Sequence, residues 1–145
     1  MSSLGVASYV RLQIEAGAGT LPYEAKDVYY GDQVKIPFVP TICVEAGSHS
    51  RQSNGAPRRY LKTIYTYVLV YLGKVQGTGE NMFEADQLAE QLEELLNADA
   101  QMAGLVIDSF VSSIEYNYLE RTNSIFRVAR LTIESRMQEQ LPSSF

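Results

Sequence analysis

Residues 60–75, YLKTIYTYVLVYLGKV, are rich in the β-branched and aromatic side chains that favour an extended strand. The apolar run within this stretch is far shorter than the roughly 18 residues that a membrane-spanning helix requires. The sequence therefore predicts a long β-strand at this position.

Both faces of this predicted strand are apolar. Side chains alternate across a strand, so one face carries Tyr65, Tyr67, Leu69 and Tyr71, and the other carries Ile64, Val68, Val70 and Leu72. A sheet with one helical layer needs an apolar surface only on its covered side. We therefore expect a second layer or a neighbouring subunit here, with Tyr65, Tyr67 and Tyr71 forming an interface strand.

Hydrophobic periodicity on either side of this strand predicts two helices and three further strands. A short amphipathic helix begins at Ser3 and ends at Gly17, and a second helix, acidic on its outer face, follows a capping-box pattern formed by Asn81 and Glu84. The remaining strands are expected at residues 41–47, 105–120 and 124–136.

This order of elements predicts an α+β fold in a single domain over residues 1–145. We expect an antiparallel sheet of about four main strands, arranged as two hairpins separated by a helix. One long acidic helix and a short N-terminal helix would cover this sheet.

Three segments are expected to lie outside the regular elements. Residues 20–40 contain Pro37 and Pro40 and are interpreted as an irregular arm. Residues 45–59 form a long inter-strand loop rich in Gly, Ser and Asn, and residues 137–145 form a flexible C-terminal tail.

Charge is strongly segregated along the chain. The net charge is −5, yet residues 75–120 contain ten acidic and no basic side chains. Such a distribution disfavours wrapping of nucleic acid, which depends on clustered Lys and Arg. It favours self-association of the protein, in which the acidic surface of one copy contacts the basic surface of another. The single cysteine, Cys43, cannot form an intramolecular disulfide, and together with the lack of a leader pattern it indicates a reducing cytoplasm.

The predicted loop contains the only histidine, in the sequence Ser48-His49-Ser50. A reactive serine requires an imidazole base that a carboxylate orients. Adjacent residues in a flexible loop do not provide this alignment, so we interpret the loop as non-catalytic and the protein as not an enzyme.

Phosphate and metal sites are equally poorly supported. Residues 77–79, GTG, precede a helix but lack the lysine of a phosphate-binding loop, which favours a simple strand-to-helix turn. Glu90, Glu93 and Glu94 fit a solvated helix face or a basic partner better than a metal site. We expect no catalytic, cofactor-binding or metal-binding residues and no cofactor.

The arginines of the same loop are better candidates for recognition. Arg58 and Arg59 follow Pro57 at the base of the loop, where arginine forks can bind a carboxylate or a phosphate. The alternative is that the pair protects the entry to a strand against aggregation. We expect a docking loop for a partner or subunit, comprising Ser48, His49, Arg51, Arg58 and Arg59.

Four segments of this chain resemble the tail terminator and head–tail joining (neck) proteins of long-tailed bacteriophages. They are VPTICVEAG, IYTYVLVYL, EADQLAEQLEELLNAD and the closing segment IEYNYLERTNSIFRVARLTIESR, and the resemblance covers about residues 36–136. It rests on the order and character of the elements. The arm at residues 20–40 is longer and richer in tyrosine than in simple members of this family.

The resemblance implies a virion structural protein of the tail or neck, assembled in the host cytoplasm. Such proteins form a homohexameric ring, stop polymerisation of the tail tube and join the tail to the head connector, while DNA passes through the lumen without specific binding. Partners would be other copies of the chain, the tail-tube protein and the connector, with no membrane. The alternatives are another neck or tail component, such as a head-completion (stopper) or tail-tube-like protein, or a small ligand-binding α+β protein.

Overall fold

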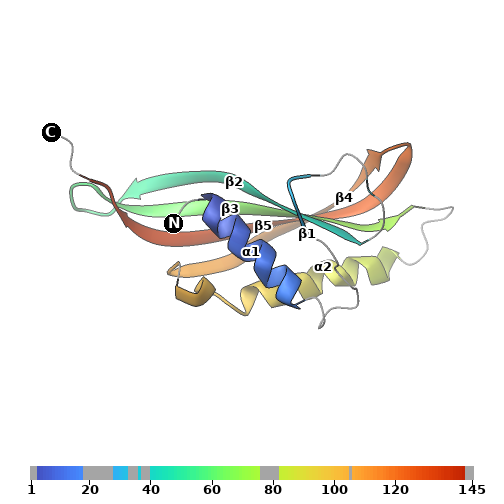
Figure 1. Cartoon of the computed structure of the whole chain (residues 1–145), viewed down its shortest axis with the longest axis horizontal. Coiled ribbons are helices and arrows are strands. Elements are labelled where there is room, and N and C mark those ends of the chain that lie inside the picture. The colour runs from blue at the N-terminus through green and yellow to red at the C-terminus, as the bar shows by residue number, and fades with distance from the viewer. Residues whose placement is uncertain are drawn as a thin grey trace.

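The computed structural model describes residues 3–17, 28–32, 36, 40–75, 82–104 and 106–142 of the chain. Within this part, a single five-stranded sheet carries two helices on one of its faces (Figure 1). In chain order the elements are α1 (Ser3–Gly17), β1 (Val28–Tyr30), β2 (Thr41–Ser53), β3 (Arg59–Lys74), α2 (Met82–Asn97), η2 (Met102–Gly104), β4 (Asp108–Arg121) and β5 (Ser124–Gln140).

The sheet has the strand order β1-β2-β3-β5-β4. Strands β2 and β3 form one antiparallel hairpin, β4 and β5 form the other, and β3 pairs with β5 to join them. The β4–β5 turn is tight because Thr122 and Asn123 both adopt positive φ, at 52° and 61°, as in a type I′ turn. The predicted arrangement of two hairpins separated by a helix is thus confirmed.

The predicted sheet of about four antiparallel strands is nevertheless wrong. A fifth strand, β1, pairs in parallel with β2, through Val28 opposite Ile42 and Tyr30 opposite Val44. The sheet is therefore mixed. A three-residue strand has too short a pattern to be recognised in sequence, and its pairing depends on contacts made by distant residues.

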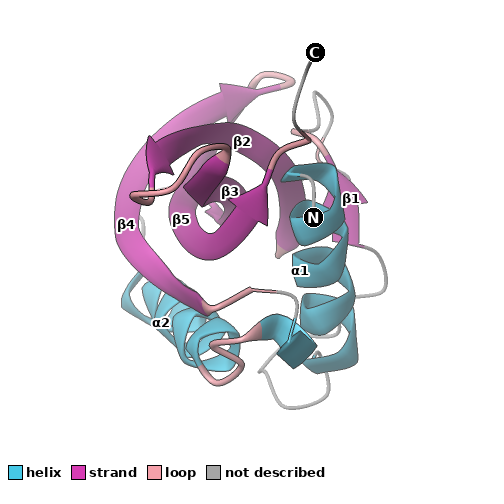
Figure 2. Ribbon diagram, turned by 90° about the vertical axis from the view of Figure 1, so that its left-hand side faces the viewer, coloured by secondary structure: helices cyan, strands magenta, loops and turns pink. Residues whose placement is uncertain are grey.

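The predicted contrast between one long and one short helix is also wrong. Helix α1 has 15 residues and α2 has 16, and both β3, with 16, and β5, with 17, are at least as long. The coarse α+β class fits, but the sheet dominates the molecule. Figure 2, along the long axis, shows how strongly this sheet is twisted and curled.

Both helices bury an apolar stripe against the same face of the sheet, as their periodicity predicts. The buried helical side chains are Val6, Ala7, Val10 and Ile14 of α1, and Leu88, Ala89, Leu92 and Leu96 of α2. They pack on alternate residues of β3, namely Ile64, Val68 and Val70, with their neighbours on β2 and β5. This layer is the main hydrophobic core.

The predicted long loop at residues 45–59 is wrong over most of its length. Strand β2 continues to Ser53, and after an irregularity between Ala46 and His49 it pairs with β3 as far as Tyr60. Only residues 54–58 form the connection, closed by a hydrogen bond from the Asn54 amide to the Arg59 carbonyl. Polar residues occupy this part of β2 because its side chains are mostly exposed.

The other two expected irregular segments are partly corrected. Residues 137–140 belong to β5, so the predicted flexible tail is wrong there, and residues 143–145 lie outside the described residues. The predicted irregular arm at residues 20–40 is wrong at β1, which is a regular strand, and most of the rest of the arm lies outside the described residues. Residues 77–79 and the capping-box residue Asn81 also lie outside them.

Candidate assembly surfaces

The face of the sheet opposite the helices, here called the open face, carries an aromatic stripe. Along β3 its half-buried members are Leu61, Tyr65, Tyr67 and Leu69, and Phe110 of β4 is also half-buried on this face. No helix among the described residues packs on this stripe, since both helices belong to the core on the other face. The expectation that both faces of β3 are apolar is confirmed.

Arginines of β5 lie over the rings of the open face. The Arg130 guanidinium is 4.1 Å from the centroid of Tyr67, and that of Arg136 is 5.6 Å from the centroid of Phe110. Both arginines are exposed. Aromatic rings flanked by arginine are enriched at protein–protein interfaces, and this is the composition that the open face presents.

Gly47 allows the ring of Tyr67 to lie against β2. A Cβ atom at this position would be 2.6 Å from the Tyr67 ring and 2.8 Å from the Tyr65 carbonyl oxygen. The glycine is therefore required by close packing, whereas the sequence alone predicts a flexible loop residue at this position.

Tyr71, the third residue of the predicted interface strand, is fully buried. Its hydroxyl donates a 2.5 Å hydrogen bond to Asp32, and its ring meets Phe126 edge-on with centroids 5.7 Å apart. Burial, together with the hydrogen bond to Asp32, raises the pKa of Tyr71 far above its ordinary value. Arg121 binds the same carboxylate at 2.8 Å, so this tyrosine belongs to a second, smaller core and Tyr65 and Tyr67 are the surface residues.

The ends of β2, β3 and β5 extend beyond α1 as a three-stranded ribbon, here called the projecting ribbon (Figure 1). Glu139 of β5 holds it together. This carboxylate accepts a 2.5 Å hydrogen bond from Arg51 of β2 and lies 3.4 Å from the ammonium of Lys62 of β3. The hydrogen bond from Arg51 and the charge of Lys62 lower the pKa of Glu139 below its ordinary 4.5.

The turn at the end of the projecting ribbon presents Arg58 and Arg59, here called the basic tip. Arg58 has a positive φ of 63° and donates from Nε to the Pro142 carbonyl at 3.0 Å. Arg59 donates from Nε to the amide oxygen of Gln140 at 3.0 Å. Both acceptors are neutral, and within the described residues neither arginine forms an ion pair.

The remaining residues of the predicted docking loop lie on β2. Ser48 is exposed, and Nδ1 of His49 lies 3.1 Å from Oγ of Ser3 at the start of α1. The structure thus brings His49 to the α1–β2 contact and places Arg51 in the Glu139 cluster. The five predicted residues therefore lie at three different places along the β2–β3 hairpin and do not converge on one point.

An open groove of about 580 Å³ runs between α2 and β4, and it is here called the acidic groove. It is lined by Glu90, Glu93, Glu94, Val111, Ser112, Ser113, Ile114 and Tyr116. Burial, followed by the charges of Asp86, Glu90 and Glu93, raises the pKa of Tyr116. The groove therefore combines three carboxylates of α2 with polar and apolar side chains of β4.

Arg127 anchors α2 to β5, a contact that the sequence did not suggest. Its guanidinium makes a bidentate contact with Asp86, at 3.1 and 2.9 Å, and lies 5.2 and 5.0 Å from the ring centroids of Tyr116 and Tyr118. The hydrogen bond to Asp86 raises the pKa of Arg127. The partners are separated by 41 positions in the sequence, so no local pattern could reveal this pair.

In the described part of the chain, no three His, Cys, Asp or Glu side chains are grouped as a metal site would require. Neither described helix is both long and apolar enough to cross a membrane. A scan against protein-family models gives no matching family, and a search of curated proteins gives no match.

Proposed function

We propose that this protein is a structural component of a bacteriophage virion. It is a ring-forming tail terminator, which caps the tail tube and provides the surface that joins the tail to the head connector. The observation that carries this proposal is the aromatic stripe on the open face. The resemblance in element order supplies the virion context.

The open face supports self-association for a physical reason. Half-buried tyrosines combine a large apolar area with a hydroxyl that needs a polar partner, which suits a contact between folded subunits. Tyr65 and Tyr67 lie at the centre of this face, and Arg130 and Arg136 lie beside them. A second copy of the chain, or an adjoining ring, would cover these side chains.

The charge distribution supports passage of DNA without specific binding. Affinity for DNA arises mainly from counterions that lysines and arginines release at phosphates. The net charge of the chain is −5, and residues 75–120 contribute only acidic charge. A lumen built from such subunits would have little affinity for the phosphate backbone.

The direct test is the assembly state of the purified full chain. We expect a homo-oligomer by light scattering and rings, hexameric if the resemblance extends to stoichiometry, by negative-stain electron microscopy. A chain that stays monomeric at high concentration and in the presence of tail tubes would overturn the proposal.

Pull-down experiments separate a terminator from another neck or tail component. A terminator must bind both the tail-tube protein and the head connector, so we expect the chain to retain each of them. Retention of only one of these partners would favour a different component of the tail or neck.

A further inference from the structure

The basic tip carries positive charge that the described chain leaves unneutralised. Among the described residues, the guanidinium groups of Arg58 and Arg59 donate hydrogen bonds to the neutral oxygens of Pro142 and Gln140, and neither forms an ion pair. By contrast, Arg51 and Lys62, further down the projecting ribbon, share the carboxylate of Glu139. The free positive charge is therefore concentrated at the extreme end of the ribbon.

The acidic groove carries the complementary charge. Glu90, Glu93 and Glu94 form no ion pair with any described residue, whereas Asp86 on the same helix is paired with Arg127. On the β4 side of the groove, apolar surface is added by Val111, Ile114 and Tyr116. The groove thus offers both charge and shape to a cationic segment.

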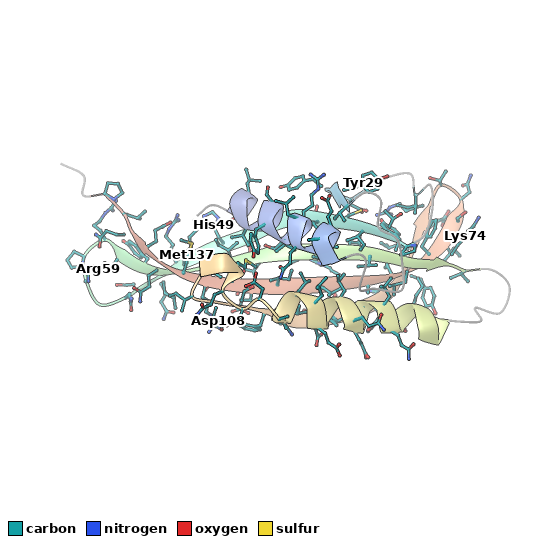
Figure 3. The ribbon with its side chains drawn as sticks, turned by 60° about the horizontal axis from the view of Figure 1, so that its bottom comes forward. Tyr29, His49, Arg59, Lys74, Asp108 and Met137 are labelled. Carbon is teal, nitrogen blue, oxygen red and sulfur yellow. The ribbon has the colours of Figure 1, made fainter. Side chains whose placement is uncertain are left out.

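The two surfaces cannot meet within one chain. Val111 of the groove pairs with Ile133 of β5, while Arg59 of the tip pairs with Gln140, seven residues further along the same strand. At about 3.3 Å per residue this separation is about 23 Å, well beyond the reach of an arginine side chain. Figure 3 shows Arg59 at one end of the long axis and α2 extending toward the end where Lys74 lies.

We propose that the basic tip of one copy docks in the acidic groove of a second copy. This inference rests on the proposed function and specifies how neighbouring subunits contact one another. The two surfaces differ, so the contact is heterologous, and repetition of such a contact closes a ring when the rotation permits. The opposite charges of the two surfaces also determine which ends of neighbouring subunits contact each other.

Charge reversal at each surface tests the contact. Arg58→Glu with Arg59→Glu reverses the tip, and Glu90→Lys with Glu94→Lys reverses the groove. Each double variant alone places like charges together, and we expect the dissociation constant of assembly to rise by about tenfold or more. Analytical ultracentrifugation measures this change, and circular dichroism confirms that each variant is folded.

An equimolar mixture of the two double variants provides the sharper test. In the mixture, every reversed tip meets a reversed groove and every native tip meets a native groove, so subunits can alternate around an even-membered ring. We expect the mixture to restore assembly. The matched controls are Arg11→Glu with Lys74→Glu and Glu15→Lys with Glu120→Lys, which make the same charge changes away from both surfaces and from the open face and should assemble normally.

If a charge reversal prevents folding, neutral variants provide the same test. These are Arg58→Gln with Arg59→Gln for the tip and Glu90→Gln with Glu94→Gln for the groove. Each should weaken assembly and reduce its dependence on salt, because charge pairing is screened by ions.

The outcomes distinguish the two proposals. If the native chain assembles and either reversed variant assembles equally well, the tip–groove contact is overturned and the proposed function stands. If neither reversed variant assembles alone and their mixture does not assemble either, the pairing of these two surfaces is overturned. A native chain that is monomeric under all conditions overturns both proposals.

Discussion

Gly47 shows how one residue determines whether two strands can lie together. Its missing side chain leaves room for the ring of Tyr67 and the carbonyl of Tyr65, at the point where the β2–β3 register is irregular. Neighbouring serines made this segment similar to a flexible loop in the sequence. The physical requirement is for small volume, since a backbone oxygen cannot move aside without distorting the ladder.

We expect Gly47→Ala to lower the free energy of unfolding by about 2 kcal/mol, the usual cost of overpacking a well-filled site. Urea unfolding at fixed protein concentration measures the change. Ser48→Ala, at the exposed neighbouring position, is the control and should alter stability by less than about 0.5 kcal/mol. Equal stability of the two variants would contradict the packing argument.

Thr66 has a buried hydroxyl without a hydrogen-bond partner among the described residues. Its side chain is fully buried in the core between the sheet and the helices. An unsatisfied buried hydroxyl is costly, so Thr66→Val, which keeps the shape, should raise the free energy of unfolding by about 1 kcal/mol. Thermal and urea unfolding test this prediction, with Thr63→Val on the open face as the control; a destabilised Thr66→Val would show that the hydroxyl is satisfied.

At the scale of elements, the projecting ribbon depends on a polar cluster where the apolar core ends. Lys62 is buried, and Glu139 joins it to Arg51, so that one carboxylate connects three strands. The helices do not extend over the end of the ribbon (Figure 1). Charge-assisted hydrogen bonds therefore stabilise a part of the sheet that lacks a helical layer.

This cluster predicts how stability depends on pH. Because folding lowers the pKa of Glu139, its contribution is fully present above the ordinary pKa of 4.5 and is lost as the pH falls through the lowered value. Glu139→Gln should thus be less stable than the native protein at neutral pH and should approach it in acid. Urea unfolding from pH 7 to pH 3 measures the difference, and the exposed Glu120→Gln serves as a control; a difference independent of pH would exclude this role for Glu139.

At the scale of the whole molecule, a single sheet with helices on one face leaves a second face for other contacts. The smaller core around Tyr71, Phe126, Val128 and Cys43 fills one end of that face. The aromatic stripe with Tyr65 and Tyr67 occupies the rest of β3 toward the projecting ribbon. Self-association over this stripe is what the proposed ring requires.

We expect Tyr65→Glu to shift the protein toward monomers while the domain remains folded, since it replaces a large aromatic ring at the interface centre with a charge opposite Glu134. Light scattering over a concentration series measures the shift, and circular dichroism checks the fold. Tyr30→Glu, at an exposed tyrosine of β1, is the matched control. Equal assembly of the two variants would exclude the open face as the contact.

The sequence by itself determined the features that depend on local periodicity. The apolar stripes of α1 and α2, the alternation along β3 and the two hairpins follow from residues close together in the chain. The segregation of acidic charge into residues 75–120, and hence the negative face of α2, is likewise a property of the sequence alone. These features suffice for the coarse class of the fold.

Only the tertiary structure decided which polar segments become strands and which side chains meet. Residues 48–53 have weak strand propensity, and they are extended because β3 supplies hydrogen-bonding partners for their backbone. Burial of Tyr71 beside Asp32, the pairing of Arg127 with Asp86 and the groove between α2 and β4 all join residues distant in sequence. Such contacts depend on how the elements pack in space, so they cannot be predicted from the periodicity of a single segment.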